Sequence, residues 1–167
     1  MLRLNSITKV YKVGVFGGKA LTAVDRVSFD VRPGEVVSLI GESGSGKSTI
    51  GKMVLGLIPA TSGTITFDGV DITAYRKDRK AYYRHVQGVF QDPFSSYNPV
   101  FKVDRVFGMI RQEYFPRVPR AEWDERVRAA LEGVRLNPGL VLGRFPHQLS
   151  GGQLQRLLIA RALLLDI

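Results

Sequence analysis

The first part of the chain is divided into short apolar segments separated by turns, a pattern typical of β-strands. Residues 2–11 alternate apolar and polar side chains, as a strand with one buried face does. Residues 24–29 carry apolar side chains ahead of an Arg-Pro-Gly turn and predict a second strand. Residues 35–40 form a short apolar run, which predicts a buried strand. Residues 64–67 predict an edge strand that ends at an Asp-Gly turn.

Helical patterns begin near residue 49 and dominate the second half of the chain. Residues 49–57 carry helix-compatible side chains, and residues 78–86 predict a second helical segment. Residues 103–113 and 121–134 show helical spacing with many charged side chains. Residues 154–165 predict a last helix.

Together these elements predict an α/β fold in two parts. Residues 1–91 would form a mixed sheet around a glycine-rich loop at 41–48, and residues 92–167 would form a mostly helical section. Residues 14–19 contain three glycines, which predicts a loop. The sequence contains neither an internal repeat nor a low-complexity linker.

Composition narrows the class of protein but leaves its partner open. The 167 residues suffice for one domain with a buried core, and 44% of them are hydrophobic. No apolar run reaches the length of a membrane span, and the start of the chain lacks the layout of a signal peptide. The absence of cysteine excludes disulfides and fits a cytoplasmic protein. The net charge of +9 favours nucleotides, nucleic acid or an anionic membrane surface without choosing among them.

A glycine-rich octet indicates the first specific chemistry. Residues 41–48 read Gly-Glu-Ser-Gly-Ser-Gly-Lys-Ser and fit the phosphate-loop (P-loop) pattern G-x-x-x-x-G-K-[ST], between a predicted strand and a predicted helix. Glycines without Cβ atoms let such a loop take positive φ angles and bring its amides close to phosphates. Lys47 would meet the β- and γ-phosphates of a nucleoside triphosphate, and the Ser48 hydroxyl would bind Mg²⁺. The predicted nucleotide-binding residues of this loop are Gly41, Glu42, Ser43, Gly44, Ser45, Gly46, Lys47, Ser48 and Thr49.

Two later segments carry further candidate chemistry, each with a purely structural alternative. Gln91 follows the apolar run 88–90, which predicts a strand, and its carboxamide can bind Mg²⁺ or water through oxygen. The alternative is an ordinary polar residue at a strand end. Leu149-Ser150-Gly151-Gly152-Gln153 opens the last predicted helix, where Ser150 can cap the helix and the glycines expose amides at the positive end of its dipole. The alternative is a capped helix without a ligand.

The phosphate loop, the glutamine segment and Leu-Ser-Gly-Gly-Gln, in this order, resemble the ATP-binding cassette (ABC) ATPases over residues 2–167. The resemblance implies a P-loop NTPase fold of the ABC type with ATP and Mg²⁺ as cofactors. Lys47 and Gln91 would be catalytic, and Ser48 and Gln91 would hold the metal. Tyr11 occupies the position of an aromatic residue that stacks on adenine, although a tyrosine at a strand end can equally serve packing. The residues that would cover the γ-phosphate of ATP bound by a second cassette are Ser150, Gly151, Gly152 and Gln153.

The resemblance narrows to one branch of the family. Residues 91–99 and 145–150 are similar to the ATPase subunits of oligopeptide, dipeptide and nickel importers. This implies an ABC transporter ATP-binding subunit at the cytoplasmic face of the cell membrane, which energises import of peptides or related small solutes. Its implied partners are a second ABC ATPase subunit, transmembrane permease subunits and, indirectly, a solute-binding protein, with no nucleic acid. Leu154 stands where the family often has arginine, a change expected to affect packing rather than binding.

The end of the sequence bears on hydrolysis. Members of the family place an acidic (Walker B) strand after the signature helix and a switch histidine later still, and neither lies within residues 1–167. Asp166 follows an apolar run, but that run continues the last predicted helix, so Asp166 is not expected to be the acidic-strand residue. The C-terminal part of the core is therefore expected to be absent, and the 167-residue chain alone is expected to hydrolyse ATP poorly.

Two other functions stay open. One is a truncated nucleotide-binding module that binds ATP without hydrolysing it. The other is a DNA-repair or chromosome-structuring ABC ATPase, for which the charge of +9 is a weak indication. Such proteins usually carry long coiled coils or zinc modules, and neither heptads nor cysteines occur in this sequence. Salt-sensitive binding to DNA would favour that function.

Overall fold

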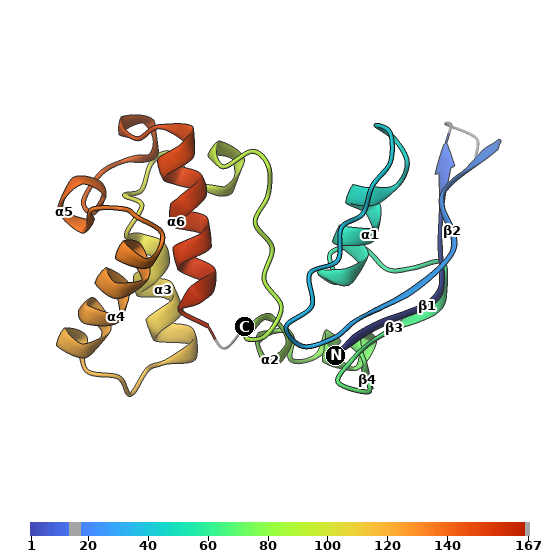
Figure 1. Ribbon diagram of the computed structural model, residues 1–167, viewed down its shortest axis with the longest axis horizontal. Coiled ribbons are helices and arrows are strands. Elements are labelled where there is room, and N and C mark those ends of the chain that lie inside the picture. Colours follow the sequence, from blue (N-terminus) through green and yellow to red (C-terminus); the bar gives the residue numbers. More distant parts are fainter. Residues whose placement is uncertain (14–17, 166–167) are drawn as a thin grey trace. The chain divides into compact units, whose positions relative to one another are not determined.

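The structure is a computed structural model that describes residues 1–13 and 18–165 (Figure 1). The chain divides into two compact units, Met1–Tyr82 and Tyr83–Ile167. The first unit contains the strands and the helix that follows the phosphate loop, and the second is built mainly from helices. Each unit has a hydrophobic core of its own.

Two predictions fall outside the described residues. Most of the loop predicted at 14–19 belongs to this group, and so does Asp166. The division predicted between residues 91 and 92, with a sheet before it and a mostly helical section after it, stays a prediction.

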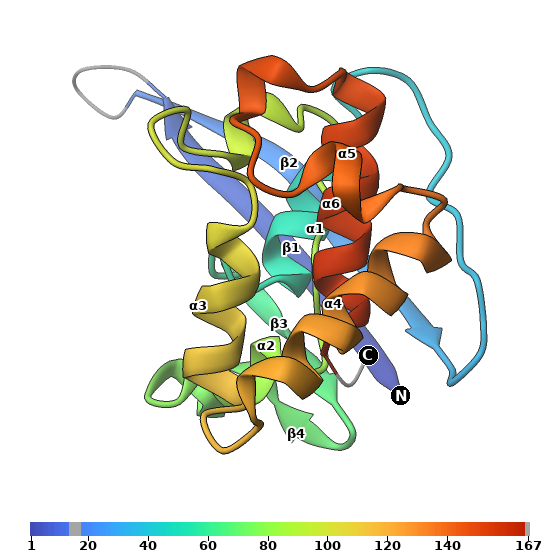
Figure 2. The ribbon, with the colours of Figure 1, turned by 90° about the vertical axis from the view of Figure 1, so that its left-hand side faces the viewer.

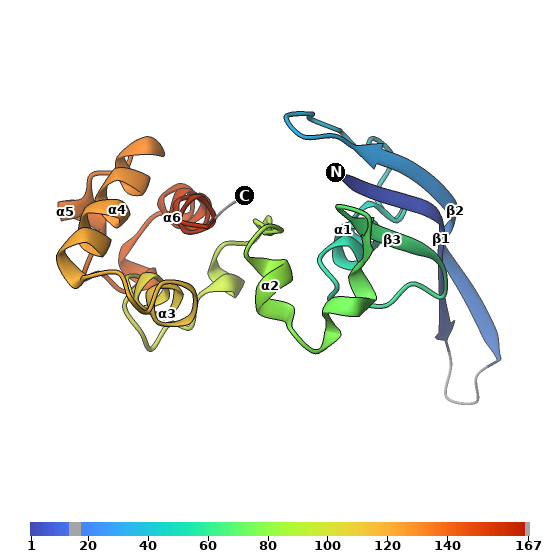
Figure 3. The ribbon, with the colours of Figure 1, turned by 90° about the horizontal axis from the view of Figure 1, so that it is seen from below.

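The first unit contains the strands β1 (Leu2–Val13), β2 (Lys19–Val31), β3 (Ser62–Phe67) and β4 (Val70–Asp71). They form one sheet in the order β2-β1-β3-β4, and each of these strand pairs is antiparallel. β1 lies between β2 and β3, so it organises the sheet (Figure 3). The strands predicted at 2–11 and 24–29 are confirmed as β1 and β2.

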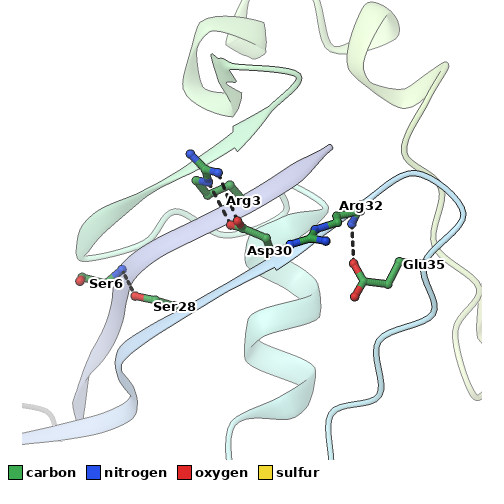
Figure 4. A network of polar contacts seen from close by, with 6 residues as sticks. All are labelled: Arg3, Ser6, Ser28, Asp30, Arg32 and Glu35. Atoms are coloured by element: carbon green, nitrogen blue, oxygen red, sulfur yellow. Dashed lines mark hydrogen bonds and ion pairs between the residues drawn. The ribbon is translucent and has the colours of Figure 1, made fainter.

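Polar groups fix the register of β1 against β2 (Figure 4). Arg3 and Asp30 are Cα partners, and the guanidinium donates from Nε to Oδ1 at 3.0 Å and from Nη2 to Oδ2 at 3.2 Å. The backbone amide of Ser6 donates to Ser28 Oγ at 2.8 Å, close to an irregularity in the β1–β2 pairing. Because exposed ion pairs contribute about 1 kcal/mol or less, these contacts align the strands more than they stabilise them.

Residues 35–40 do not form the predicted strand. The turn before them is closed by the amide of Arg32, which donates to Glu35 Oε2 at 2.8 Å (Figure 4). The segment itself has no regular secondary structure, and Val36 and Ile40 are 92% and 94% exposed. A continuous apolar run is buried as a strand only where neighbouring strands and covering helices surround it. None of the described strands pairs with this run.

β3 confirms the strand predicted at 64–67, but the prediction that it is an edge strand is wrong. It pairs with β1 on one side and with β4 on the other. Asp68 and Gly69 connect β3 to β4 with φ angles of 48° and 81°, both positive as a two-residue type I′ hairpin loop requires. β4 spans only two residues, which is too short for a hydrophobic pattern to predict.

Helix α1 (Lys47–Val54) lies against one face of the sheet (Figure 3). It confirms the helix predicted at 49–57, although it begins and ends earlier. Ile50 and Met53 are three residues apart, lie on the same helix face and are both buried. The core that they form with the strands consists of Leu4, Ile7, Val24, Ile50, Met53 and Ile65.

The remaining helices are α2 (Arg79–Tyr83), α3 (Arg105–Tyr114), α4 (Arg120–Gly133), α5 (Pro138–Val141) and α6 (Gly151–Leu163). The helices predicted at 103–113, 121–134 and 154–165 are confirmed with small shifts of their ends. The helix predicted at 78–86 is shorter, because it is only the five-residue α2. In the second unit α4 crosses α6, and the two helices pack against each other (Figure 2).

The core of the second unit is formed mainly by apolar side chains of α3, α4 and α6, with further residues from α5 and the connecting segments. Leu154 is fully buried in it, which agrees with the expectation that this residue affects packing. Within the part of the chain that the structure describes, no helix is long and apolar enough to cross a bilayer. The buried residues of this core are Val103, Phe107, Ile110, Trp123, Val127, Leu131, Leu136, Val141, Leu149, Leu154, Leu157, Ala160 and Leu165.

Candidate functional site

The phosphate loop leads directly into α1, so its amides lie at the N-terminal end of that helix. Gly44 and Gly46 have φ angles of 87° and 91°, as predicted for positions that need glycine. Gly41 does not have a positive φ, but a Cβ atom there would lie 2.7 Å from Ser45 Oγ. Glycine is therefore favoured at 41 by close approach and at 44 and 46 by backbone angle.

Strand β2 packs closely against the phosphate loop at Gly46. A Cβ atom on Gly46 would lie 2.3 Å from the carbonyl oxygen of Ala23 and 3.3 Å from Val24 Cγ2. The carbonyl oxygen of Gly46 accepts a hydrogen bond from the backbone amide of Ile50 at 2.9 Å. This is the first hydrogen bond of α1. The end of the loop is thus held between the sheet and the helix. Sequence reasoning missed this contact because it joins segments that are distant in sequence and carry no shared motif.

Lys47 reaches back across the loop. Its Nζ atom donates to the carbonyl oxygens of Gly41 at 2.8 Å and Glu42 at 2.6 Å, and to Ser45 Oγ at 3.1 Å. The ammonium group therefore lies among oxygen acceptors at the place where the loop turns. A phosphate chain that entered the loop would offer the same group stronger, charged acceptors.

The start of α1 offers further groups to an anion. The first amides of an α-helix have no acceptor within the helix, and no side chain caps this one at Gly46. Ser48 and Thr49 lie in this first turn, and Ser48 is exposed with a hydroxyl oxygen that a hard cation can accept as a ligand. The described residues contain no group of three or more His, Cys, Asp or Glu side chains that could hold a metal ion.

Tyr11 lies on the strand pair that supports the loop. Its Cα partner is Leu21 on β2, two residues before Ala23, which contacts the loop at Gly46. The side chain is 36% exposed, and Lys9 Nζ lies 5.2 Å from the centre of its ring. The structure thus places an accessible aromatic ring on this strand pair, while its contact with a base stays a prediction.

In the second unit, the signature segment forms the start of α6. Ser150 Oγ accepts from the backbone amide of Gln153 at 3.2 Å, and Gln153 Oε1 accepts from the amide of Ser150 at 2.8 Å. This reciprocal pair is a capping box, so the predicted cap at Ser150 is confirmed. Gly151 and Gly152 occupy the first two helical positions, where a helix provides no backbone acceptor for their amides. The box orders the turn and leaves those two amides for another acceptor.

Replacing Ser150 with alanine is expected to lower the free energy of unfolding of this unit by about 1 kcal/mol, the usual contribution of an N-cap oxygen. Urea unfolding followed by the fluorescence of Trp123, the only tryptophan of the sequence, would measure the change. Ser150→Asp is the matched variant, because aspartate retains a capping oxygen and should recover most of the loss. Equal stabilities of Ser150→Ala and the unchanged chain would contradict the role of the cap.

Gln91 lies in an exposed bend, and the run 88–90 before it is not the predicted strand. A strand needs a ladder partner, and none of the described strands pairs with this run. Asp92 starts a tight turn directly afterwards, where its Oδ1 atom accepts from the amide of Phe94 at 3.0 Å. The carboxamide of Gln91 is therefore accessible, as a ligand-contacting role requires.

A half-buried polar cluster lies beside this segment, and sequence reasoning missed it. Arg161 Nη2 donates to the carbonyl oxygen of Gly88 at 3.1 Å and to Gln87 Oε1 at 3.4 Å. Burial lowers the pKa of Arg161 from its usual value and raises the pKa of Tyr97 to about 12, so the tyrosine is neutral at neutral pH. The only available signal was a charged residue within the apolar run of the last helix.

Comparisons with known proteins agree with these features. Residues 24–167 match the family described as ABC transporter. The dimeric structure of MJ0796, a bacterial ABC transporter cassette, has a TM-score of 0.84 at 31% sequence identity, with 98% of this chain and 69% of that chain covered. A second structure of MJ0796, described as a post-hydrolysis state bound to ADP and Pi, gives the same values. These similarities confirm the predicted α/β fold class, a P-loop NTPase of the ABC type.

Relatives of known sequence point to the same family. A Brucella ovis protein named "Putative peptide import ATP-binding protein" is 42% identical over 169 residues, which cover 99% of this chain and 51% of that protein. The oligopeptide transport ATP-binding protein OppF of Escherichia coli is 40% identical over 149 residues, 89% of this chain and 44% of that protein. The chain thus spans about half the length of the curated relatives it matches. With its phosphate loop, its capped Leu-Ser-Gly-Gly-Gln helix and these matches, the chain belongs to the ABC transporter family.

Proposed function

We propose that this chain is the ATP-binding portion of an ABC importer subunit, which energises the import of peptides or related small solutes by ATP binding and hydrolysis at a dimer interface. The observation that carries the proposal is the phosphate loop. Gly44 and Gly46 take positive φ angles, the loop amides lie at the start of α1, and Lys47 Nζ lies within 3.1 Å of three loop oxygens. Membership of the family implies ATP hydrolysis.

The residues of the loop fit a triphosphate. The Lys47 ammonium would exchange its present acceptors for β- and γ-phosphate oxygens, which bind it more strongly because they are charged. The loop amides and the first amides of α1 would donate to the same phosphates, while Tyr11 would stack on the adenine. Phosphoryl transfer depends mainly on positioning and electrostatic stabilisation, which these groups supply.

Mg²⁺, when bound with the triphosphate, would supply positive charge that neutralises part of the phosphate charge. We assign Ser48 and Gln91 as its protein ligands, on the basis of an exposed hydroxyl in the first turn of α1 and an exposed carboxamide after the run 88–90. Lys47 would hold the γ-phosphate in line, and Gln91 would also orient the attacking water. These two residues are the catalytic groups that we propose within this chain.

The signature segment is assigned to a second nucleotide site. The capping box leaves the amides of Gly151 and Gly152 for another acceptor, and the positive end of the α6 dipole favours an anion there. We propose that Ser150, Gly151, Gly152 and Gln153 cover the γ-phosphate of ATP held by the phosphate loop of a second ABC subunit. The solved MJ0796 cassette is described as dimeric, which supports this arrangement.

Peptide import is supported by the relatives. Those with about 40% identity are named for peptide import and for oligopeptide transport. The partners proposed here are a second ABC subunit, membrane-embedded permease subunits and, indirectly, a solute-binding protein. The proposed location is the cytoplasmic face of the membrane, where such permease subunits would hold the chain.

The 167 residues by themselves are proposed to hydrolyse ATP slowly. Neither an apolar strand ending in Asp-Glu nor a later histidine follows the signature helix within them. Phosphoryl transfer needs a carboxylate near the metal and a group that orients water, and Gln91 alone supplies only part of this set. Release of phosphate measured alongside nucleotide binding would test the point, and rapid turnover that Lys47→Ala abolishes would overturn it.

Removing Mg²⁺ is expected to weaken ATP binding by the 167-residue chain about tenfold, the effect of losing about 1.4 kcal/mol of charge-assisted contact. Titration calorimetry with ATP in excess Mg²⁺ and then in EDTA would measure the change. AMP is the matched ligand, because it retains the adenine but lacks the phosphates assigned to the loop. Equal affinities for ATP and AMP would contradict the assignment of the loop, and absence of ATP binding at millimolar concentration would overturn the proposed function.

A further inference from the structure

Helix α6 contacts the segment around Gln91 at three levels. At its start, a Cβ atom on Gly151 would lie 3.7 Å from Cε2 of the Phe94 ring. One turn later, Gln155 Nε2 donates to the carbonyl oxygen of Phe90 at 3.2 Å. Near its end, Arg161 donates to the carbonyl oxygen of Gly88. The residue numbers rise along the helix and fall along the segment, so the two run antiparallel.

The spacing of these contacts matches the two backbones. From Gln155 to Arg161 an α-helix rises about 9 Å. From Phe90 to Gly88 an extended chain covers about 7 Å, and the length of the arginine side chain makes up the difference. Figure 1 shows the part of the chain between α2 and the short 3₁₀ helix Phe94–Ser96 passing along α6.

Side chains of α6 supply the hydrogen bonds that hold this segment. The run 88–90 belongs to no helix or strand, and Val89 and Phe90 are 40% and 44% exposed. The described hydrogen bonds to its carbonyl groups come from Arg161 and Gln155. The direction in which the backbone enters Gln91 therefore depends on two side chains of a helix that begins more than fifty residues later in the sequence.

The hydrogen bonds described for the Arg161 side chain go to this segment and to Gln87 just before it. It is half-buried, and among the described residues no carboxylate forms an ion pair with it. Its Nε atom and the hydroxyl of Tyr97 are both buried without a hydrogen-bond partner in the described structure. Burying a guanidinium costs free energy unless its N–H groups donate hydrogen bonds. The bonds to Gly88 and Gln87 therefore offset much of the cost of burying Arg161.

We propose that Arg161, assisted by Gln155, is a positioning residue that fixes the backbone before Gln91 to the signature helix. Gln91 and the Leu-Ser-Gly-Gly-Gln segment would then respond as one unit to nucleotide. A ligand bound at the start of α6 would change the presentation of Gln91 through the helix, without touching Gln91 itself. The response to nucleotide rests on the function proposed above. The attachment of residues 88–90 to α6, called the tie below, rests only on the contacts within the second unit.

Hydrogen exchange of the 167-residue chain tests the tie directly. In Arg161→Met, the amides of residues 88–92 are expected to exchange at least tenfold faster, while those of α3 and α4 keep their rates. Arg156→Met is the matched control, since Arg156 is also on α6 but donates to the carbonyl groups of Gly152 and Arg135. That control should leave the exchange of 88–92 unchanged. Arg161→Lys, which retains a charged donor, should restore part of the protection.

A second variant keeps the proposal open to refutation if Arg161→Met does not fold. Gln155→Met removes a single donor at a half-exposed position and is expected to raise the exchange of 90–92 at least threefold. Unchanged exchange in this segment for either folded variant would overturn the proposal. The same holds if exchange rises equally in α3, α4 and 88–92, because that pattern is general destabilisation.

Nucleotide affinity separates this inference from the proposed function. Because Gln91 is assigned to Mg²⁺ and to the water that attacks the γ-phosphate, Arg161→Met is expected to weaken ATP binding three- to tenfold and to leave ADP binding unchanged. If the unchanged chain binds no ATP, the proposed function fails while the exchange experiment still decides the tie. If ATP and ADP binding weaken equally while exchange at 88–92 rises, the tie holds and its link to the γ-phosphate is overturned.

Discussion

Replacing Lys47 with alanine is expected to weaken ATP binding about 100-fold, equivalent to about 2.7 kcal/mol. The ammonium group lies within 3.1 Å of the oxygens of Gly41, Glu42 and Ser45, so it is already placed where the loop turns. A phosphate chain in the loop would meet it as a charged partner, and hydrogen bonds between charged groups contribute about 1.5–3 kcal/mol each. Titration calorimetry with MgATP measures the loss.

Lys52→Ala is the control for this prediction. Lys52 is an exposed residue of the same helix, five positions after Lys47. Its replacement by alanine removes the same positive charge from the chain. Its affinity for ATP should stay within about twofold of the unchanged chain, since exposed charges away from the site act only through screened, long-range effects. Equal losses in both variants would mean that net charge, and not the position of Lys47, governs binding. Circular dichroism should show that both variants remain folded.

Leu157→Ala is expected to destabilise the second unit by about 2–5 kcal/mol, the range for removing a large aliphatic side chain from a packed core. Leu157 is 0% exposed on α6, in the same core as Leu131 and Trp123. The free energy of unfolding of a whole domain is only about 5–15 kcal/mol, so this loss would remove a large part of the stability. Urea unfolding followed by Trp123 fluorescence should show a midpoint lower by at least about 1 M.

The matched variant is Leu163→Ala, at the last residue of the same helix, where the side chain is 52% exposed. Exposed substitutions of this kind usually change stability by about 0.5 kcal/mol or less. A midpoint for Leu157→Ala that coincides with that of Leu163→Ala would contradict the assigned core.

Features with local causes could be predicted from the sequence. The cap at Ser150 depends on a hydroxyl and a glutamine three residues later, and both are visible in the sequence. The positive φ angles of Gly44 and Gly46 depend on the absence of a side chain. The strand at β1 was visible because one of its faces is buried, which imposes alternation on the sequence.

Features that depend on distant partners could not be predicted in the same way. Residues 35–40 and 88–90 have the composition of strands, but a strand exists only where a neighbouring strand accepts its hydrogen bonds. Composition carries no information about that neighbour. Arg161 was hidden for a related reason, because its acceptors are backbone carbonyl groups, which look the same in every sequence.

The support of Gly46 by Ala23 makes the sheet and the phosphate loop thermodynamically coupled. A ligand that binds only the present shape of the loop stabilises every contact that maintains this shape, by an amount that grows with ligand concentration. Binding of a ligand to the loop and the stability of the β1–β2 pair then rise and fall together. A substitution in β2 far from any phosphate would change nucleotide affinity by altering how often the empty loop is already in its binding shape.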